Sequence, residues 1–298
     1  MNWQGLMPAI TTQIAADGQI DHDFVARHVT WLIDHGCDGI VPCGSLGEGA
    51  TLDFDEKIEL MSTCVDALGG RAPVVPGIAA TSTRTAVRLC ERAKSVGCRG
   101  LMILPPYVHA GDAHETRAHF EAMLAATDLP CMLYNNPIAY GADVRPEQVA
   151  ELAARHPNLR AVKESSGDVR RITAIKALCG DRLAVFVGLD DLVLEGVAMG
   201  ACGWVAGLVN ALPAESVRLF ELARAGEREK AAALYRWFLP LLRMDTVPEF
   251  VQLIKLVQHE VGHGTEVVRA PRIPIHGRAR DVALATIREA LRTRPSLR

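Results

Sequence analysis

Short apolar runs alternate with amphipathic segments along most of the chain. Each run is four or five residues long, and apolar residues at helical spacing follow it. We interpret the runs as strands at residues 6–10, 39–42, 73–76, 100–104, 130–134, 159–163, 183–187 and 203–206. Strands that are apolar on consecutive positions indicate a parallel sheet that is buried on both faces.

The helical pattern predicts eleven helices. The last strand is followed by its own barrel helix, and three further helices come after that one. They cover residues 21–35, 53–68, 83–96, 113–126, 146–155, 168–178, 190–199, 213–224, 227–243, 248–259 and 280–292. Eight strand–helix units favour a (β/α)8 TIM barrel over an open doubly wound sheet. We expect residues 1–212 to form the barrel core. Residues 213–298 would add the last barrel helix and a C-terminal helical extension of the same domain.

Composition narrows the classes of function. Hydrophobic residues make up 49% of the 298 positions and charged residues 22%, with a formal net charge of −3. The absence of a basic block argues against a nucleic-acid partner. No apolar run approaches the ~18 residues of a membrane span, and no signal-peptide pattern opens the chain, so we expect a cytoplasmic protein. Eight scattered cysteines without a C-x-x-C pair fit reduced thiols.

One lysine stands apart from the other five. Active residues of a barrel lie at the carboxyl ends of its strands, and only Lys163 ends a predicted strand. An ammonium group at the end of an apolar strand is costly to keep charged, so its pKa should fall. A neutral amine beside a cavity is a Schiff-base nucleophile. The alternative is that Lys163 reaches solvent or pairs with Glu164.

Two hydroxyl groups at other strand ends could move protons for this amine. Tyr134 would be the acid/base if the lysine lowers the pKa of its phenol, and Ser45 could relay the proton or hold the phenol. The turn at residues 44–48 offers backbone N–H groups to a carboxylate. The structural alternative is that Tyr134 caps the barrel and that the glycines of this turn only permit a tight bend.

Two motifs that could bind a metal ion are interpreted as structural. Residues 259–263 match the H-E-x-x-H zinc pattern, but Gly262 should break the helix that must present both imidazoles, so no metal is expected. Asp190 and Asp191 follow a strand, and we interpret them as helix N-caps rather than metal ligands.

Three motifs, in order, resemble those of the dihydrodipicolinate synthase/N-acetylneuraminate lyase family of class I aldolase-like enzymes. They are residues 44–48 (GSLGE), 134–137 (YNNP) and 162–168 (VKESSGD). The resemblance covers essentially the whole chain. It implies a TIM barrel, a homotetramer built as a dimer of dimers, and no cofactor beyond a covalent lysine imine.

The same resemblance implies the roles of individual residues. Lys163 would form the imine, Tyr134 would be the acid/base, Ser45 would be the relay hydroxyl, and Tyr107 would be a candidate for reaching between subunits. The expected substrate-binding residues are Gly44, Leu46, Gly47, Asn136, Ser165, Gly188 and Val205.

Departures from the family pattern narrow the reaction. Leu46 replaces a second hydroxyl, Val108 a second tyrosine, and Ala139 stands near the place of a carboxylate-binding arginine, which argues against lysine biosynthesis. Residues 134–140 and 235–242 look like the bacterial hydroxyproline-degrading branch. That branch deaminates Δ1-pyrroline-4-hydroxy-2-carboxylate to 2,5-dioxopentanoate and ammonia.

Three alternatives to this deaminase stay open. The chain could be a dehydratase or aldolase of a 2-keto-3-deoxy sugar acid, an enzyme like dihydrodipicolinate synthase, or a non-catalytic member that binds a keto acid. In each case the expected partner is a small keto acid or cyclic imine.

Overall fold

A curled sheet of seven parallel strands forms the centre of the computed structural model, which describes residues 1–109 and 111–297. Around the sheet the strands follow the order β1-β7-β6-β5-β4-β3-β2. They are β1 (Gly5–Pro8), β2 (Gly77–Ile78), β3 (Leu101–Ile103), β4 (Cys131–Asn135), β5 (Leu159–Glu164), β6 (Ala184–Val187) and β7 (Gly203–Ala206). Nearly every residue of these strands is buried, as the apolar runs predicted.

The predicted strand at residues 39–42 closes the ring between β1 and β2. It makes two isolated parallel bridges, Ala9 to Val41 and Ile40 to Val74, in place of a continuous ladder. Backbone hydrogen bonds of 2.8 Å join it to both neighbours, as from Val41 N to the carbonyl of Pro8. With this eighth segment the sheet is a closed TIM barrel, and the predicted fold is confirmed.

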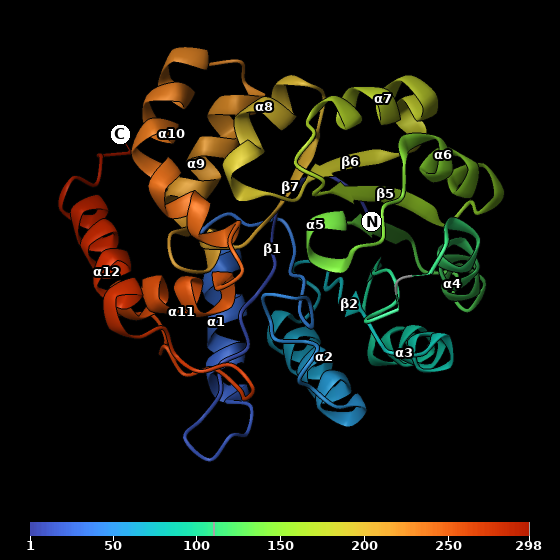
Figure 1. The fold of residues 1–298 in the computed structure, drawn as a ribbon, viewed down its shortest axis with the longest axis horizontal. Helices are drawn as coiled ribbons and strands as arrows, with labels where there is room; N and C mark the ends of the chain where they lie inside the picture. Colours follow the sequence, from blue (N-terminus) through green and yellow to red (C-terminus); the bar gives the residue numbers. More distant parts are fainter. Residues whose placement is uncertain (110, 298) are drawn as a thin grey trace.

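Most helices lie around the sheet in chain order, and the C-terminal ones gather at one side (Figure 1). They are α1 (His22–Asp34), α2 (Phe54–Leu68), α3 (Thr83–Val96), α4 (Ala113–Ala125), α5 (Pro137–Tyr140), α6 (Pro146–Arg155), α7 (Arg170–Cys179), α8 (Val193–Ala198), α9 (Pro213–Arg224), α10 (Arg228–Leu242), α11 (Phe250–Glu260) and α12 (Gly277–Arg292). Short 3-10 turns are η1 (Gly180–Arg182), η2 (Asp190–Leu192), η3 (Leu208–Asn210) and η4 (Arg243–Asp245). None of the helices in the described part of the chain is long and apolar enough to cross a membrane.

Helix starts follow from local sequence. Asp53 caps α2, and its carboxylate and that of Glu56 form the predicted capping box. The single-turn helix α5 was not predicted. It begins at Pro137 because the Asn136 side chain accepts a hydrogen bond from the N–H of Ala139.

The C-terminal extension is tied to the barrel through a buried ion pair. The pair joins Lys255 on α11 to Glu48 in the loop after the closing segment, and their side chains are 1% and 0% exposed. The lysine donates a hydrogen bond to the carboxylate at 2.5 Å. The N–H of Arg269 donates to the other carboxylate oxygen at 2.9 Å. The extension therefore supports a loop at the carboxyl end of the barrel.

Candidate active site at the carboxyl end of the barrel

Lys163 points into the barrel from β5. In the strand register it pairs with Tyr134 of β4 on one side and with Phe186 of β6 on the other, so these three side chains share the inner face. Its side chain is buried, and Nζ lies 4.2 Å from the centre of the Tyr134 ring. Burial lowers the pKa of Lys163 to about 8, although Asp245 and Asp190 favour the charged form. The expected fall in pKa is confirmed.

Glu164 does not pair with this lysine. Successive residues of a strand point to opposite faces, so the Glu164 side chain lies outside the barrel interior. Its carboxylate accepts hydrogen bonds from Asn135 Nδ2 at 3.1 Å and from the N–H of Ser166 at 2.6 Å. The alternative of a Lys163–Glu164 pair is therefore wrong.

Tyr134 holds its proton more tightly than expected. Its hydroxyl accepts a hydrogen bond from Asn136 Nδ2 at 3.0 Å. Burial raises the pKa of Tyr134 to about 12, and the hydrogen bond from Asn136 opposes the rise without cancelling it. The expected lowering of this pKa by the lysine is wrong, because the cost of burying a phenolate outweighs the hydrogen bonds that favour it. At neutral pH Tyr134 is thus a proton donor.

Ser45 belongs to a cluster of hydroxyl groups beside Tyr134. Its Oγ is hydrogen-bonded to the hydroxyl of Tyr140, while the Tyr134 hydroxyl is held by Asn136. The Tyr140 ring contacts Tyr107 and Tyr134, with centroids 5.5 and 5.8 Å away. Tyr140 was not among the predicted site residues, because its segment was interpreted only as a mark of the hydroxyproline-degrading branch and as lacking a cation. Tyr107 thus lies beside this cluster in its own chain.

The turn that carries Ser45 bends sharply. Cys43 and Glu48 at its ends have left-handed φ angles of 60° and 57°. A Cβ on Gly47 would lie 2.8 Å from the carbonyl oxygen of Ile10, so only glycine fits there. Among the described residues, the N–H groups of Ser45 and Leu46 form no hydrogen bond. The turn thus leaves backbone donors for an anion.

Three predicted binding residues form the layer above Lys163. The strand register aligns Lys163 with Phe186 and Gly203. The next inward-facing position on each strand, two residues further along, is Ser165, Gly188 and Val205, respectively. A Cβ on Gly188 would lie 1.9 Å from Ser165 Oγ and 2.7 Å from Lys163 Cε. The lysine stem therefore occupies the space that glycine leaves open. Ser165 Oγ is buried near the Tyr134 hydroxyl, whose pKa it helps to lower, but it forms no hydrogen bond of ordinary geometry with a described residue.

Asp190 does not cap its own helix, so that interpretation was wrong. Its fully buried carboxylate accepts from Trp204 Nε1 at 2.9 Å and from the N–H groups of Gly207 at 3.1 Å and Leu208 at 2.8 Å. It therefore joins the loop after β6 to β7 and to the start of η3. Burial raises the pKa of Asp190 to about 6, against these hydrogen bonds and the charge of Lys163.

A second carboxyl group, Asp245, was missed altogether. It ends η4, far from any predicted barrel strand, and no local motif marks it. Its carboxyl group lies against Gly207, where a Cβ would be 2.0 Å from Oδ1. Burial and the charge of Asp190 raise the pKa of Asp245 well above the usual range, while Lys163 opposes the rise.

The H-E-x-x-H segment does not present two imidazoles on one helix. Helix α11 ends at Glu260, and His263 Nε2 lies 2.8 Å from Nδ1 of His28 on α1. Within residues 1–109 and 111–297 no three His, Cys, Asp or Glu side chains are grouped as metal ligands.

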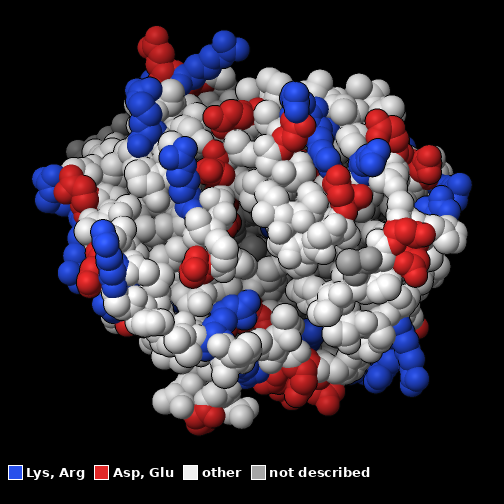
Figure 2. All heavy atoms as spheres, viewed as in Figure 1, with Lys and Arg blue, Asp and Glu red and all other residues white. Residues whose placement is uncertain are grey.

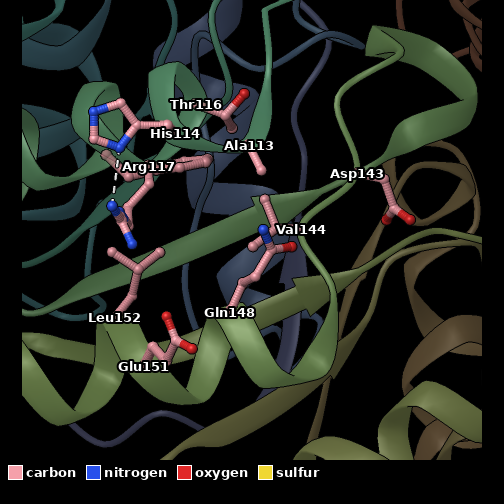
Figure 3. Close-up of a pocket in the computed structure, with 10 residues that line it drawn as sticks. Ala113, His114, Thr116, Arg117, Asp143, Val144, Gln148, Glu151 and Leu152 are labelled. Atoms are coloured by element: carbon pink, nitrogen blue, oxygen red, sulfur yellow. Dashed lines mark hydrogen bonds between the residues drawn. The ribbon is translucent and has the colours of Figure 1, made fainter.

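A cavity of about 260 Å³ lies outside the barrel (Figure 3), between α4 and α6. Arg117, Gln148 and Glu151 are among its lining residues, and Arg117 donates to His114 at 2.9 Å. None of its lining residues belongs to the predicted site. In the spheres of Figure 2, one face of the molecule is hollowed near its centre, and charged side chains of both signs lie mostly around the margin.

The sequence comparisons agree with this geometry. The model of the dihydrodipicolinate synthetase family matches residues 2–290. A 4-hydroxy-tetrahydrodipicolinate synthase of Geobacter metallireducens is 33% identical over 96% of this chain and 97% of its own length. The enzyme of the same name from Methanoculleus marisnigri is 36% identical over 83% of this chain and 86% of its own.

Solved structures of related proteins superpose over nearly the whole chain. The dihydrodipicolinate synthase DapA-2 from Bacillus anthracis gives a TM-score of 0.92 at 28% identity, covering 99% of this chain and 100% of its own. YagE, a prophage protein of the dihydrodipicolinic acid synthase family from E. coli K12 in complex with pyruvate, gives 0.91 at 26% identity, covering 98% and 99%.

Proposed function

Because the chain belongs to the dihydrodipicolinate synthetase family, whose members are lysine Schiff-base lyases that need no external cofactor, we propose that Lys163 is its imine-forming residue. We propose further that it deaminates Δ1-pyrroline-4-hydroxy-2-carboxylate to 2,5-dioxopentanoate and ammonia. The observation that carries the proposal is a buried amine, with its pKa lowered to about 8, stacked on the phenol of Tyr134.

The first step is addition of the neutral Lys163 amine to C2 of the cyclic imine. The ring nitrogen takes one proton from Tyr134 and one from the lysine nitrogen, and it then leaves C2 as an amine, which opens the ring. The product is a protonated lysine imine beside a tyrosine phenolate. The cationic imine stabilises the phenolate, so a phenol with a pKa of about 12 in the free protein can act as the proton source.

The second step is elimination across C3 and C4. The phenolate takes a proton from C3, the electrons form the C3=C4 bond, and the C4 hydroxyl leaves as water after gaining a proton. Tautomerisation moves the double bond to C5, where water displaces ammonia. A second water molecule then releases the product from Lys163.

The surroundings of the amine support a small 2-keto or 2-imino acid. The free N–H groups of the Ser45 turn and the unpartnered Ser165 hydroxyl offer donors to the substrate carboxylate and to an adjacent oxygen. Leu46 is buried at the same turn, which favours a compact ring over a polyhydroxylated chain. Exposed Ala139 on α5 offers no cation to a second carboxylate.

One observation favours a second candidate function. The clustered hydroxyl groups of Ser45, Tyr107 and Tyr140 would suit the hydroxyl groups of a linear 2-keto-3-deoxy sugar acid, as substrate of a dehydratase or aldolase. Both candidates require the same lysine imine and differ only in the substrate.

Borohydride reduction in the presence of pyruvate tests the imine. We expect a mass increase of one reduced pyruvate on the peptide that contains Lys163, and none in Lys163→Arg. Lys57→Arg is the matched control, because Lys57 is also buried but donates to the carbonyl of Ala79. Unlabelled Lys163 in the wild type would contradict the proposal and favour a non-catalytic keto-acid binder.

Ammonia release tests the substrate. The wild type is given the imine derived from cis-4-hydroxy-D-proline and, separately, 2-keto-3-deoxy-arabonate, and dioxopentanoate is measured for both. Ammonia and dioxopentanoate from the first substrate alone support the deaminase. Turnover of the second substrate alone would replace it with the dehydratase.

We propose that the protein assembles as a homotetramer, a dimer of dimers, on the evidence of the family resemblance. Native mass spectrometry checks this proposal, and a monomer under native conditions would contradict it.

A further inference from the structure

Asp245 approaches the surroundings of Lys163 from the β7 side of the barrel, whereas Tyr134 stands on β4, the strand next to that of the lysine. Around the barrel, β4 with Tyr134 adjoins β5 with Lys163, and β6 separates β5 from β7. The carboxyl group of Asp245 lies over Gly207, the first residue after β7. A Cβ on Gly207 would be 2.0 Å from Oδ1 and 2.9 Å from Oδ2, so the carboxyl group fills the space of a missing side chain. A substrate bound to Lys163 would therefore lie between a phenol and a carboxyl group.

The two carboxyl groups next to Gly207 differ in what holds them. Both oxygens of Asp190 accept hydrogen bonds from neighbouring N–H groups, so its carboxylate is structural. Asp245 is half-buried, and no hydrogen bond to its carboxyl group is formed within residues 1–109 and 111–297. Only Asp245 is free to bind a ligand.

We propose that Asp245 is the acid that protonates the C4 hydroxyl of the imine-bound substrate as it leaves. The inference rests on the proposed function. The Tyr134 phenolate takes the C3 proton, the C–H electron pair becomes the C3=C4 bond, and the C4–O bond breaks. The proton of Asp245 joins the departing oxygen, which leaves as water, and solvent later returns a proton to the carboxylate. No oxidation or reduction occurs.

Two physical arguments support this role. Hydroxide is a poor leaving group, and a positioned acid accelerates such a departure by about 100-fold or more. Burial and the nearby charge of Asp190 raise the pKa of Asp245, so this carboxyl group keeps its proton at a pH where an exposed aspartate has lost it.

The test separates proton removal at C3 from departure of the hydroxyl group. Asp245→Asn keeps the shape of the side chain but cannot give up a proton. We expect its release of ammonia to fall about 100-fold. Its exchange of the pyruvate methyl protons for deuterium, followed by NMR, should stay within about threefold of the wild type, because exchange needs only the imine and Tyr134. Retained exchange and borohydride labelling also show that the variant is folded.

Asp191→Asn is the matched control, since the Asp191 carboxylate pairs at 3.9 Å with Arg243, which lies in the same turn η4 as Asp245. It should change neither rate by more than about twofold. The role of Asp245 would be overturned if Asp245→Asn released ammonia at the wild-type rate, or if it lost proton exchange and ammonia release equally. Either result would leave the proposed function standing. A wild type that exchanges pyruvate protons but releases no ammonia would overturn the proposed function, and this role with it.

Discussion

At the scale of single residues, Gly188 decides where the lysine can stand. Its missing side chain leaves room for the stem of Lys163 and for the hydroxyl of Ser165. Sequence reasoning expected Gly188 to contact the substrate, and the structure shows a packing contact with Lys163 itself. The conformational freedom of glycine is not needed here, because its φ angle is not left-handed.

Gly188→Ala should therefore displace the amine. The added methyl group would lie 2.7 Å from Lys163 Cε, so we expect borohydride labelling by pyruvate to slow by about tenfold or more. The double variant Gly188→Ala/Ser165→Ala removes the closer of the two clashes. It should recover only part of the rate, and full recovery would show that the lysine contact is unimportant.

Tyr134→Phe should abolish proton transfer with little change in packing. The buried ring stays, and the hydroxyl that accepts from Asn136 is lost. We expect pyruvate proton exchange to fall by about 100-fold to 10,000-fold. Asn136→Ala retains the phenol, so it should retain more exchange than Tyr134→Phe. The reverse order would contradict the acid/base role.

At the scale of elements, Asp190 joins three of them: the loop after β6, the strand β7 and the turn η3. Asp190→Asn would replace one acceptor oxygen with an amide N–H that faces other N–H groups. We expect the free energy of unfolding in urea to fall by about 2–4 kcal/mol. Asp191→Asn, outside this network, should change it by less than about 0.5 kcal/mol. Equal effects would contradict the assignment.

Element identities were largely predictable because periodicity dominates in this chain. The predicted helix at residues 83–96 and the helix α3 coincide, and capping residues place the start of α2. The predicted helix at residues 190–199 was less successful. It breaks into η2 and α8, because Asp190 binds N–H groups of another element instead of its own.

The candidate site was predictable wherever a residue ends a strand. Lys163 and Tyr134 were found in this way, since the order of strands fixes their proximity. Asp245 was not, because it reaches the site from a turn between two helices outside the barrel. Burial of lysines was also not predicted: Lys57 lies in a helix with charged neighbours and Lys255 in a late helix, yet both are buried. Local sequence does not reveal which face of a helix meets another element.

At the scale of the whole molecule, Lys163 makes activity and stability depend on pH in the same direction. With a folded pKa of about 8, the neutral amine is a minority at pH 7. The initial rate of borohydride-trapped imine formation should rise with pH and level off above about 8. A flat profile between pH 6 and 9 would contradict a titrating nucleophile.

The effect on stability follows from the same pKa. The folded value of about 8 is below the ordinary 10.5, so between these values the unfolded chain binds more protons. The free energy of unfolding therefore rises with pH across that window. At pH 7, below this window, Lys163→Met should stabilise the protein by up to about 3 kcal/mol in urea unfolding, because the folded protein no longer has to hold a buried ammonium group. Destabilisation would indicate that the ammonium is well paired.

The buried pair Lys255–Glu48 predicts a large effect at a distance from the site. Lys255→Met leaves the fully buried Glu48 carboxylate with only the more distant Arg272, at 3.9 Å, as its cation, which should cost up to about 3–5 kcal/mol of unfolding free energy. Lys255→Met/Glu48→Gln removes both charges and should recover more than half of the loss. A single variant as stable as the wild type would contradict the role of this pair.

The ion pair also bears on the order in which the protein is made. A ribosome completes Tyr134 and Lys163 long before Asp245 and Lys255, so a nascent barrel carries its amine before the acid and the brace of the Ser45 turn exist. We expect a newly made chain to acquire elimination activity only when its last quarter has docked. If the proposed function holds, the amine of a nascent chain cannot complete the elimination until synthesis is nearly finished.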